Sequence, residues 1–339
     1  MITQKLSLID EQSSPLFRIM YLANPDEPAR RHFDNNICAF HIGGGYILSV
    51  AHNLRSEAGL FKSMDESVYQ QEIVSKLDPS QRDLFDQYFF FDNYTSKRYI
   101  NIPDPNGAQT VINILSHIGF DTRWITLLQR NFCNPYLIVH FSNELFYNDP
   151  VLTAQFNVNS HFPEPSLNRH SFLIELELVE PFYSQDIALY RIVNTPKAVV
   201  EKLPAIEIDD RICDDDQQDY YCLQSAPGGA LGRLLNQAHI EGFLDHHGAF
   251  PDRIGGNYIF EGTRYLIKGY FRFGSSGAPY VFLDKASGQF KVNAIQSEAS
   301  PIQLSIKNDR EGNFQYINAI AVPLANVTDR VRQLMSEGA

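Results

Sequence analysis

Strand-type segments recur along most of this chain, in two stretches that an acidic connector separates. Strings of the first stretch, such as SPLFRIMYL, NICAFHI and SFLIELELVE, mix β-branched and aromatic residues with polar ones. Strings of the second, such as AHIEGFL, YLIKGYF and FKVNAIQS, have the same character, and the connector reads IEIDDRICDDDQQDYYC. Because this mixture is typical of strands, the pattern predicts a mainly β protein. We expect a first β unit over residues 1–200 and a second over residues 201–339.

The first β unit is interrupted by an insert of different character, at about residues 56–130. The string DPSQRDLFDQYFFFDNY offers Asp78 or Ser80 as a helix N-cap ahead of good helix formers. A later string, NGAQTVINILSHIGFDTRWITLLQRNF, carries apolar residues at helical spacing. These residues are Val111, Ile112, Ile114, Leu115 and Ile118. The insert is therefore predicted to be mostly helical, with the aromatic residues of QYFFFDNY as its packing face.

The last residues of the chain, NVTDRVRQLMSEG, also have a helical pattern. Val327, Val331 and Leu334 repeat at helical spacing, and Asn326 or Thr328 could cap the helix. The sequence therefore predicts one helix after the second β unit.

The composition argues against several classes of function. The chain has 339 residues, of which 44% are hydrophobic, and this is enough to bury a substantial core. Its net charge of −12 argues against a nucleic-acid-binding protein, since phosphate binding needs clustered Lys and Arg. No apolar run reaches the roughly 18 residues that a membrane span needs, and the first residues do not read as a secretory signal. We therefore expect a cytoplasmic protein that binds neither nucleic acid nor membranes, with Cys38, Cys133, Cys213 and Cys222 as reduced thiols.

Three short strings carry residues that could act together in catalysis: SVAHN with His52, SQDIALYRI with Asp186, and FGSSGAPYV with Ser276. A serine hydroxyl is a weak nucleophile at neutral pH, so it needs a base within hydrogen-bond reach. That base in turn needs a buried carboxylate to orient it and to stabilise its cation. Flanking glycines permit a tight turn whose backbone N–H groups can hold an oxyanion. In this chain the N–H groups of Gly274 and Ser276 are the expected donors.

The order of the three residues discriminates between the folds of serine hydrolases. An α/β-hydrolase would need its histidine after the serine, but no histidine follows Ser276. A subtilisin-type enzyme would place the aspartate before the histidine. The observed order, histidine then aspartate then serine, is that of chymotrypsin.

In this order, the three strings resemble motifs of the chymotrypsin-like serine protease family. YILSVAHN looks like the family's strand that ends in Thr-Ala-Ala-His, DIALYRI resembles Asp-Ile-Ala-Leu-Leu, and GSSGAP resembles Gly-Asp-Ser-Gly-Gly-Pro. The resemblance covers most of residues 14–55 and 165–339, and the insert has no counterpart in the family. It implies two six-stranded antiparallel β-barrels, a C-terminal helix and an active site between the barrels. It implies no cofactor.

The resemblance also implies a function, that of a serine endopeptidase that cleaves protein substrates through an acyl-enzyme intermediate. The implied site residues are His52, Asp186 and Ser276 as the catalytic triad, Gly274 and Ser276 as oxyanion donors, Tyr270 and Phe271 near the base of the specificity pocket, and Ser297 and Glu298 beside the substrate peptide. No acidic residue lies at the expected floor of the pocket, so a preference for Lys or Arg is not supported.

Three positions depart from the family's pattern, one of them being Ala278, which replaces a glycine next to the nucleophile turn. Asn53 stands where the family's secreted members usually have a cysteine, so the disulfide beside the histidine is absent. Ser275 replaces the aspartate that pairs with a freshly cut N-terminus in zymogens, so activation through that ion pair is not expected. The departures at Asn53 and Ser275 are typical of the family's intracellular branches.

Each of the three residues also has a purely structural interpretation. His52 could be a core histidine, Asp186 a strand-start carboxylate bound by turn amides, and Ser276 part of an ordinary turn between strands. The chain could accordingly be a catalytically silent peptide-binding or adaptor protein, or a protease that is active only when bound to a partner. The insert at 56–130 is then the expected docking surface for that regulatory partner.

Two further strings suggest metal sites without fitting one. HIEGFLDHHGAF holds three histidines, but their spacing matches no zinc template and no cysteine lies nearby. DDRICDDDQQD lacks the glycine and the terminal glutamate of a calcium-binding loop. We therefore expect a loop near the substrate cleft and a solvated acidic connector at these places, and no metal.

Overall fold

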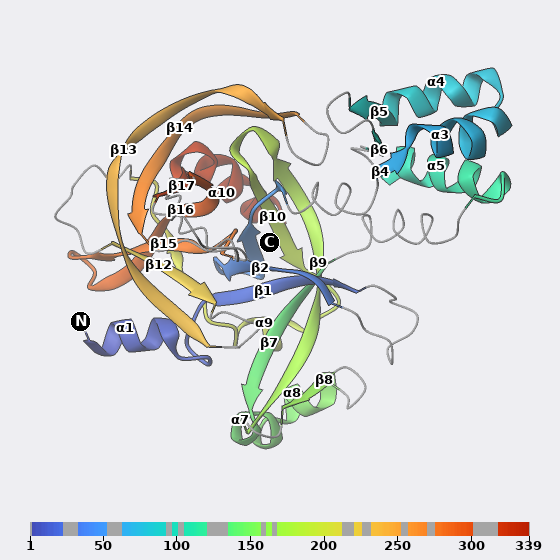
Figure 1. The fold of residues 1–339 in the computed structure, drawn as a ribbon. Coiled ribbons are helices and arrows are strands. Elements are labelled where there is room, and N and C mark those ends of the chain that lie inside the picture. The colour runs from blue at the N-terminus through green and yellow to red at the C-terminus, as the bar shows by residue number, and fades with distance from the viewer. Residues whose placement is uncertain are drawn as a thin grey trace, which may run out of the picture. The chain divides into compact units, whose positions relative to one another are not determined.

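The structure of the chain is a computed structural model, and its contacts divide the chain into two units (Figure 1). The first unit comprises residues 1–50, 134–247 and 260–339, and the second comprises residues 51–133 and 248–259. The structure describes residues 2–22, 33–52, 63–92, 97–100, 105–120, 135–156, 161–164, 168–211, 220–225, 232–251, 257–269, 275–300 and 318–338.

Six strands of the first unit form a closed barrel. They are β1 (Leu16–Leu22), β2 (Phe33–His41), β3 (Tyr46–Ser49), β7 (Tyr136–Ser142), β9 (Arg169–Phe182) and β10 (Ile187–Ile192). Neighbouring strands pair in the order β10, β3, β2, β1, β7 and β9, and β9 closes the ring by pairing with β10. All these ladders are antiparallel. A short strand, β8 (His161–Glu164), extends the sheet beside β9.

A second barrel is built from strands later in the chain, which lie in the same unit except for residues 248–259. They are β12 (Tyr220–Ser225), β13 (Arg233–Pro251), β14 (Asn257–Gly269), β15 (Pro279–Asp284), β16 (Gln289–Ser300) and β17 (Asn318–Pro323). Their order is β16, β15, β12, β13, β14 and β17, and β16 pairs with β17 to close the ring. The short strand β11 (Glu207–Ile208) adds to β16 in parallel. The prediction of two six-stranded antiparallel barrels is confirmed.

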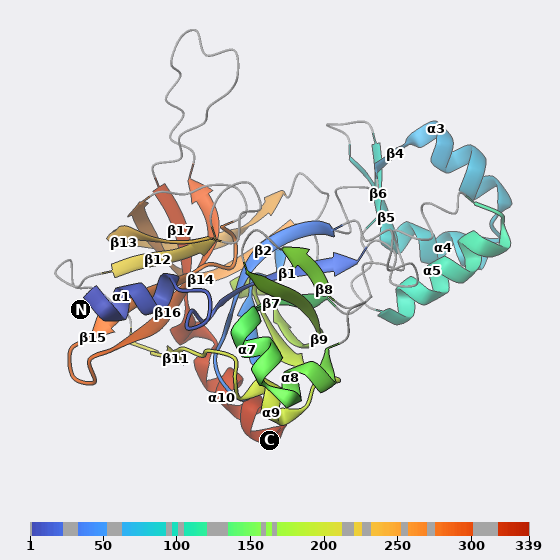
Figure 2. The same cartoon turned by 90° about the horizontal axis from the view of Figure 1, so that it is seen from below.

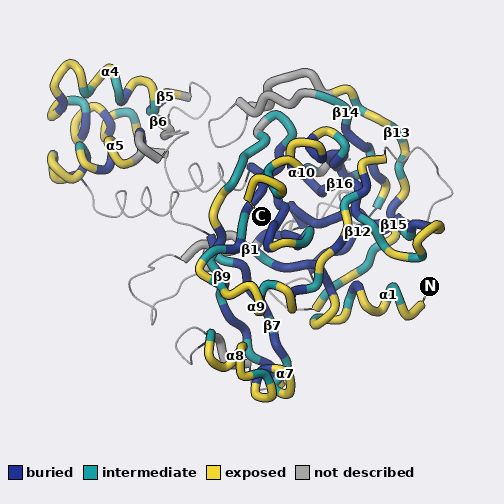
Figure 3. The backbone as a smooth tube through the Cα atoms, turned by 180° about the vertical axis from the view of Figure 1, so that it is seen from behind, coloured by how far each residue is buried: buried dark blue, intermediate teal, exposed yellow. Residues whose placement is uncertain are grey.

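The mixture of apolar and polar residues in the strand-type segments corresponds to buried and exposed positions along the barrel strands. In Figure 3 most strands of the two barrels are largely buried, whereas β13 is mostly intermediate or exposed over residues 233–245, where Ala238 is its one buried residue. Strand β3 is buried along its whole length, between β2 and β10. Three glycines with positive φ, Gly43 at 98°, Gly44 at 61° and Gly45 at 82°, form the tight turn that leads into β3. The turn therefore fixes the direction of the strand that leads to His52.

The predicted C-terminal helix is α10 (Thr328–Glu337), which follows the 3-10 turn η8 (Leu324–Asn326). It leaves the second barrel and reaches the first, where the Tyr46 hydroxyl donates to the Leu334 carbonyl and Arg330 pairs with Glu180 (Figure 2). The expected side-chain cap is wrong, because the N-cap residue is Val327, which makes no side-chain cap bond.

Four shorter helical segments accompany the barrels of the first unit. They are α1 (Ile2–Ile9), α7 (Asn143–Asn148), α8 (Pro150–Gln155) and α9 (Lys197–Val200). None of the helices in the described part of the chain is long and apolar enough to span a membrane. The histidine-rich string HIEGFLDHHGAF belongs to the long strand β13, so the expectation of a loop there is wrong.

The second unit combines helices with a small sheet. Its elements are β4 (Ser63–Asp65), α3 (Glu66–Val68), the π-helix η2 (Tyr69–Ile73), the 3-10 turn η3 (Val74–Lys76), α4 (Pro79–Tyr88), β5 (Phe89–Asp92), β6 (Lys97–Ile100) and α5 (Pro105–His117). Asp78 caps α4 as predicted, in a reciprocal capping box with Gln81. Phe85 and Phe89 are buried and their rings stack 5.0 Å apart. The three-stranded sheet, in the order β4, β6 and β5, was not predicted.

Candidate active site

Ser276 lies in a tight turn immediately before β15, and both barrels hold this turn. The Ala278 N–H donates to the Ser275 carbonyl at 2.9 Å, which closes the turn. The Gly277 N–H donates to the Gln296 carbonyl of β16 at 2.9 Å. From the first barrel, the Cys38 N–H of β2 donates to the Ser276 carbonyl, also at 2.9 Å. Ser276 itself is half-buried, so its position is fixed while it retains access to solvent.

Gly277 is the residue that allows the first barrel to approach this turn. Its φ is +83°, and a Cβ atom there would lie 1.9 Å from the Cys38 carbonyl oxygen and 2.7 Å from Ser49 Oγ. The Ser49 hydroxyl in turn donates to the same Cys38 carbonyl at 2.7 Å. Only glycine fits this space, because backbone atoms cannot move aside as a flexible side chain can.

Asp186 occupies the turn between η6 (Tyr183–Gln185) and β10, and it is fully buried. Its φ of 54° lies in the left-handed region, which Asp tolerates better than most residues. The Ser297 hydroxyl of β16 donates a hydrogen bond to Asp186 Oδ2. Ser297 was predicted to lie beside the substrate, and the structure places its hydroxyl on the predicted catalytic carboxylate.

Two neighbouring residues of β16 therefore connect Asp186 with the Ser276 turn. Gln296 accepts from Gly277 through its carbonyl, and Ser297 donates to Asp186 through its hydroxyl. The predicted carboxylate and the predicted nucleophile are thus attached to neighbouring residues of one strand, although they lie 90 positions apart in the sequence.

His52 follows β3 by three residues and is half-buried. In the antiparallel ladder between β3 and β10, Ser49 lies opposite Ala188. The end of β3 that leads to His52 is therefore next to the beginning of β10, which follows Asp186 by one residue. His52 itself belongs to the second unit.

The remaining predicted residues fall into two groups. Gly274, Tyr270 and Phe271 lie outside the described residues, so the second oxyanion donor and the base of the specificity pocket have no structural description. Glu298 follows Ser297 in β16 and is half-buried. Within the described ranges, no three His, Cys, Asp or Glu side chains are grouped to hold a metal ion.

One residue beside Asp186 was not predicted from the sequence. Arg264 of β14 is fully buried, and its guanidinium donates to the Ser184 carbonyl and to Gln185 Oε1. Burial lowers the pKa of Arg264, and the charges of Asp186 and Glu298 oppose that shift. The sequence gives little signal for this arginine, because TRYLIKGY reads as an ordinary strand in which Arg and Lys occupy polar positions.

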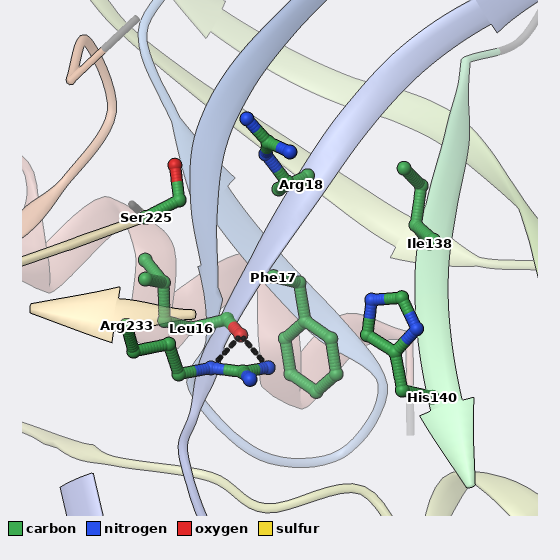
Figure 4. Close-up of a pocket in the computed structure, with 7 residues that line it drawn as sticks. All are labelled: Leu16, Phe17, Arg18, Ile138, His140, Ser225 and Arg233. Carbon is green, nitrogen blue, oxygen red and sulfur yellow. Dashed lines mark hydrogen bonds between the residues drawn. The ribbon is translucent and has the colours of Figure 1, made fainter. Parts of the chain in front are cut away.

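A separate small pocket contains none of the predicted site residues (Figure 4). It is lined by Leu16, Phe17, Arg18, Ile138, His140, Ser225 and Arg233. Arg233 donates to the Leu16 carbonyl, and the Phe17 ring lies between Arg233 and His140 in Figure 4. Burial, together with the charges of Arg169, Arg233 and Arg18, lowers the pKa of His140 to about 3. His140 is therefore neutral and a weak base, unsuited to accept a proton from a serine at neutral pH.

Comparisons with known proteins give no sequence relative. No family model matches the sequence, and no curated protein matches it. Among solved structures, the active form of the Rv3671c protease from M. tuberculosis is similar, with 11% identity, coverage of 96% of this chain and 81% of that chain, and a TM-score of 0.41. Deg5 has 10% identity, coverage of 99% and 96%, and a TM-score of 0.42. The MamO protease domain from Magnetospirillum magneticum has 10% identity, coverage of 94% and 97%, and a TM-score of 0.40. Values this low leave the assignment of function to the site itself.

Proposed function

We propose that this chain is a serine endopeptidase whose catalytic triad is His52, Asp186 and Ser276. The observation that supports this most strongly is the double attachment of β16, through Gln296 to the Ser276 turn and through Ser297 to Asp186. A buried carboxylate and a serine on a glycine-dependent turn, held by adjacent residues of one strand, are two of the three groups that the chemistry needs.

In the proposed mechanism, Ser276 Oγ attacks the carbonyl carbon of the scissile peptide bond while His52 accepts the hydroxyl proton. His52 then donates that proton to the leaving amine, and water repeats the cycle to release the acyl-enzyme. Asp186 orients His52 and stabilises its cation. The N–H groups of Gly274 and Ser276 hold the oxyanion, and no cofactor takes part.

The substrate is a protein or peptide that lies along β16, beside Ser297 and Glu298. Tyr270 and Phe271 are proposed to line the base of the specificity pocket, without a preference for Lys or Arg. We place the enzyme in the cytoplasm, and the insert at 56–130 is the proposed docking surface for a regulatory protein.

The first test is hydrolysis of fluorescently labelled casein by the purified full-length chain. Ser276→Ala should lower the rate of hydrolysis at least about 10⁴-fold, because the nucleophile is removed and the other triad residues cannot replace it. Ser287→Ala is the control, since Ser287 is a serine of the β15–β16 turn whose hydroxyl donates to Asp284 Oδ2 and accepts from the Gln289 N–H. We expect this control to hydrolyse casein at the wild-type rate.

Two results would contradict the proposal. Hydrolysis that survives Ser276→Ala would show that another group is the nucleophile. A folded wild-type chain that binds casein peptides without cleaving them, with and without the control substitution, would instead indicate the catalytically silent peptide-binding protein.

A further inference from the structure

A buried arginine from the second barrel holds the loop of the first barrel that carries Asp186. Arg264 Nη2 donates to the Ser184 carbonyl at 2.8 Å, and Nη1 donates to Gln185 Oε1 at 3.0 Å. Ser184 and Gln185 are the two residues that precede Asp186. Arg264 therefore fixes both the backbone and a side chain of the turn in which Asp186 has its left-handed conformation.

A second contact from the same barrel reinforces this attachment. Asn326 Nδ2 of η8 donates to Gln185 Oε1 at 2.8 Å, so this oxygen accepts from both Arg264 and Asn326. With the Ser297 hydroxyl on Asp186 itself, three elements of the second barrel and its C-terminal extension, β14, β16 and η8, bind one three-residue segment of the first. These contacts fix the segment to the second barrel through both its backbone and its side chains.

The charge of Arg264 needs an explanation beyond packing. An arginine stays protonated in proteins, and a buried cation is costly unless anions compensate it. Among the described residues, the charged groups that act on Arg264 include Asp186 on the loop and Glu298 on β16. Gln185, which accepts a hydrogen bond from Arg264, is uncharged, and so is Asn326, which donates to the same Gln185 oxygen. An apolar side chain would fill this place at a lower cost, which suggests that the charge itself has a role.

We infer that Arg264 is a positioning residue that holds Asp186 in place and lowers the proton affinity of the Asp186–His52 pair. This inference rests on the proposed function. A fixed cation near Asp186 disfavours a further proton on the carboxylate, or on an imidazole that is hydrogen-bonded to it. His52 thereby stays in its basic form at lower pH.

The test measures the rate of covalent labelling by a fluorophosphonate probe between pH 5 and pH 9. Labelling needs the same nucleophile and base as peptide cleavage but no knowledge of the natural substrate. Arg264→Met keeps a long side chain and removes the charge. We expect it to move the acidic limb of the rate to higher pH by at least about 1 pH unit, because the loss of a nearby positive charge favours protonation of the pair. At pH 6 this corresponds to about a 10-fold slower reaction.

Arg264→Lys separates charge from geometry. The lysine retains a cation, so the acidic limb should stay within a few tenths of a pH unit of wild type. A single ammonium does not reproduce the fork that reaches Ser184 and Gln185 together, so the plateau rate should fall about 10-fold. Arg233→Met is the control, because Arg233 is a half-buried arginine of the same barrel that donates to the Leu16 carbonyl instead (Figure 4). Its acidic limb and plateau should match wild type.

The outcomes separate this inference from the proposed function. If wild type is labelled and Arg264→Met has the wild-type acidic limb, the inference is wrong and the protease assignment stands. If wild type is folded and unlabelled, the protease assignment fails and the inference fails with it. If Arg264→Met does not fold, Arg264→Lys tests the inference. A lysine variant whose plateau rate of labelling equals that of wild type would overturn the positioning role of Arg264.

Discussion

Asp186→Asn should lower kcat/KM for peptide hydrolysis about 10⁴-fold and leave the fold unchanged. Asparagine tolerates the left-handed φ of 54° and can still accept the Ser297 hydroxyl bond through its amide oxygen. It cannot stabilise a histidine cation, and it favours the wrong tautomer of the imidazole. The loss should appear in kcat with little change in KM, measured on a cleaved peptide at neutral pH.

Asp284→Asn is the matched control for this substitution. Asp284 is another buried carboxylate that accepts from a serine hydroxyl, here Ser287 at 2.7 Å, and it also pairs with Arg211. It takes no part in the proposed site. If Asp186→Asn and Asp284→Asn reduced kcat/KM by similar small factors, Asp186 would have only a structural role.

Gly277→Ala should destabilise the first unit and abolish activity together. The added Cβ would lie 1.9 Å from the Cys38 carbonyl oxygen, so the Ser276 turn and β2 must separate. That separation breaks the bond from the Cys38 N–H to the Ser276 carbonyl, and alanine at a φ of +83° adds backbone strain. We expect a loss of about 2–4 kcal/mol in the free energy of unfolding, measured by denaturant titration.

Gly288→Ala distinguishes the clash from the backbone strain. Gly288 also has a positive φ, +68°, but a Cβ there would meet only Gln4 Nε2, at 3.9 Å. This variant should lose about 1–2 kcal/mol and keep wild-type activity. Equal losses of stability in the two variants would mean that the first barrel does not constrain the Ser276 turn.

The sequence was sufficient to predict the architecture because its signals are local. Strand-type strings, the three glycines before β3 and the capping box at Asp78 each depend on residues close together in the chain. The two barrels and the C-terminal helix follow from these patterns together with the motif resemblance. The prediction of Asn326 or Thr328 as a helix cap was wrong because the chain enters α10 from a 3-10 turn. The Thr328 hydroxyl donates to the Leu324 carbonyl of that turn.

The parts of the site that the sequence did not predict depend on contacts between distant residues. Ser297 reaches Asp186 across 111 positions, and Arg264 reaches Ser184 across 80. The groups that compensate the buried charge of Arg264 lie far from it in the sequence, so they cannot be recognised from the residues next to Arg264. The small sheet of the second unit was missed for a related reason. Its strand β5, FFFD, continues directly from α4, and its aromatic residues fit the packing face of a helix equally well.

The most direct test of the account is to locate the fluorophosphonate adduct by mass spectrometry of the digested full-length protein. The account predicts one adduct, on Ser276, which disappears in Ser276→Ala and forms at least about 10³-fold more slowly in His52→Ala, where the base is missing. An adduct on a different residue, or a folded wild-type protein that forms no adduct, would contradict it.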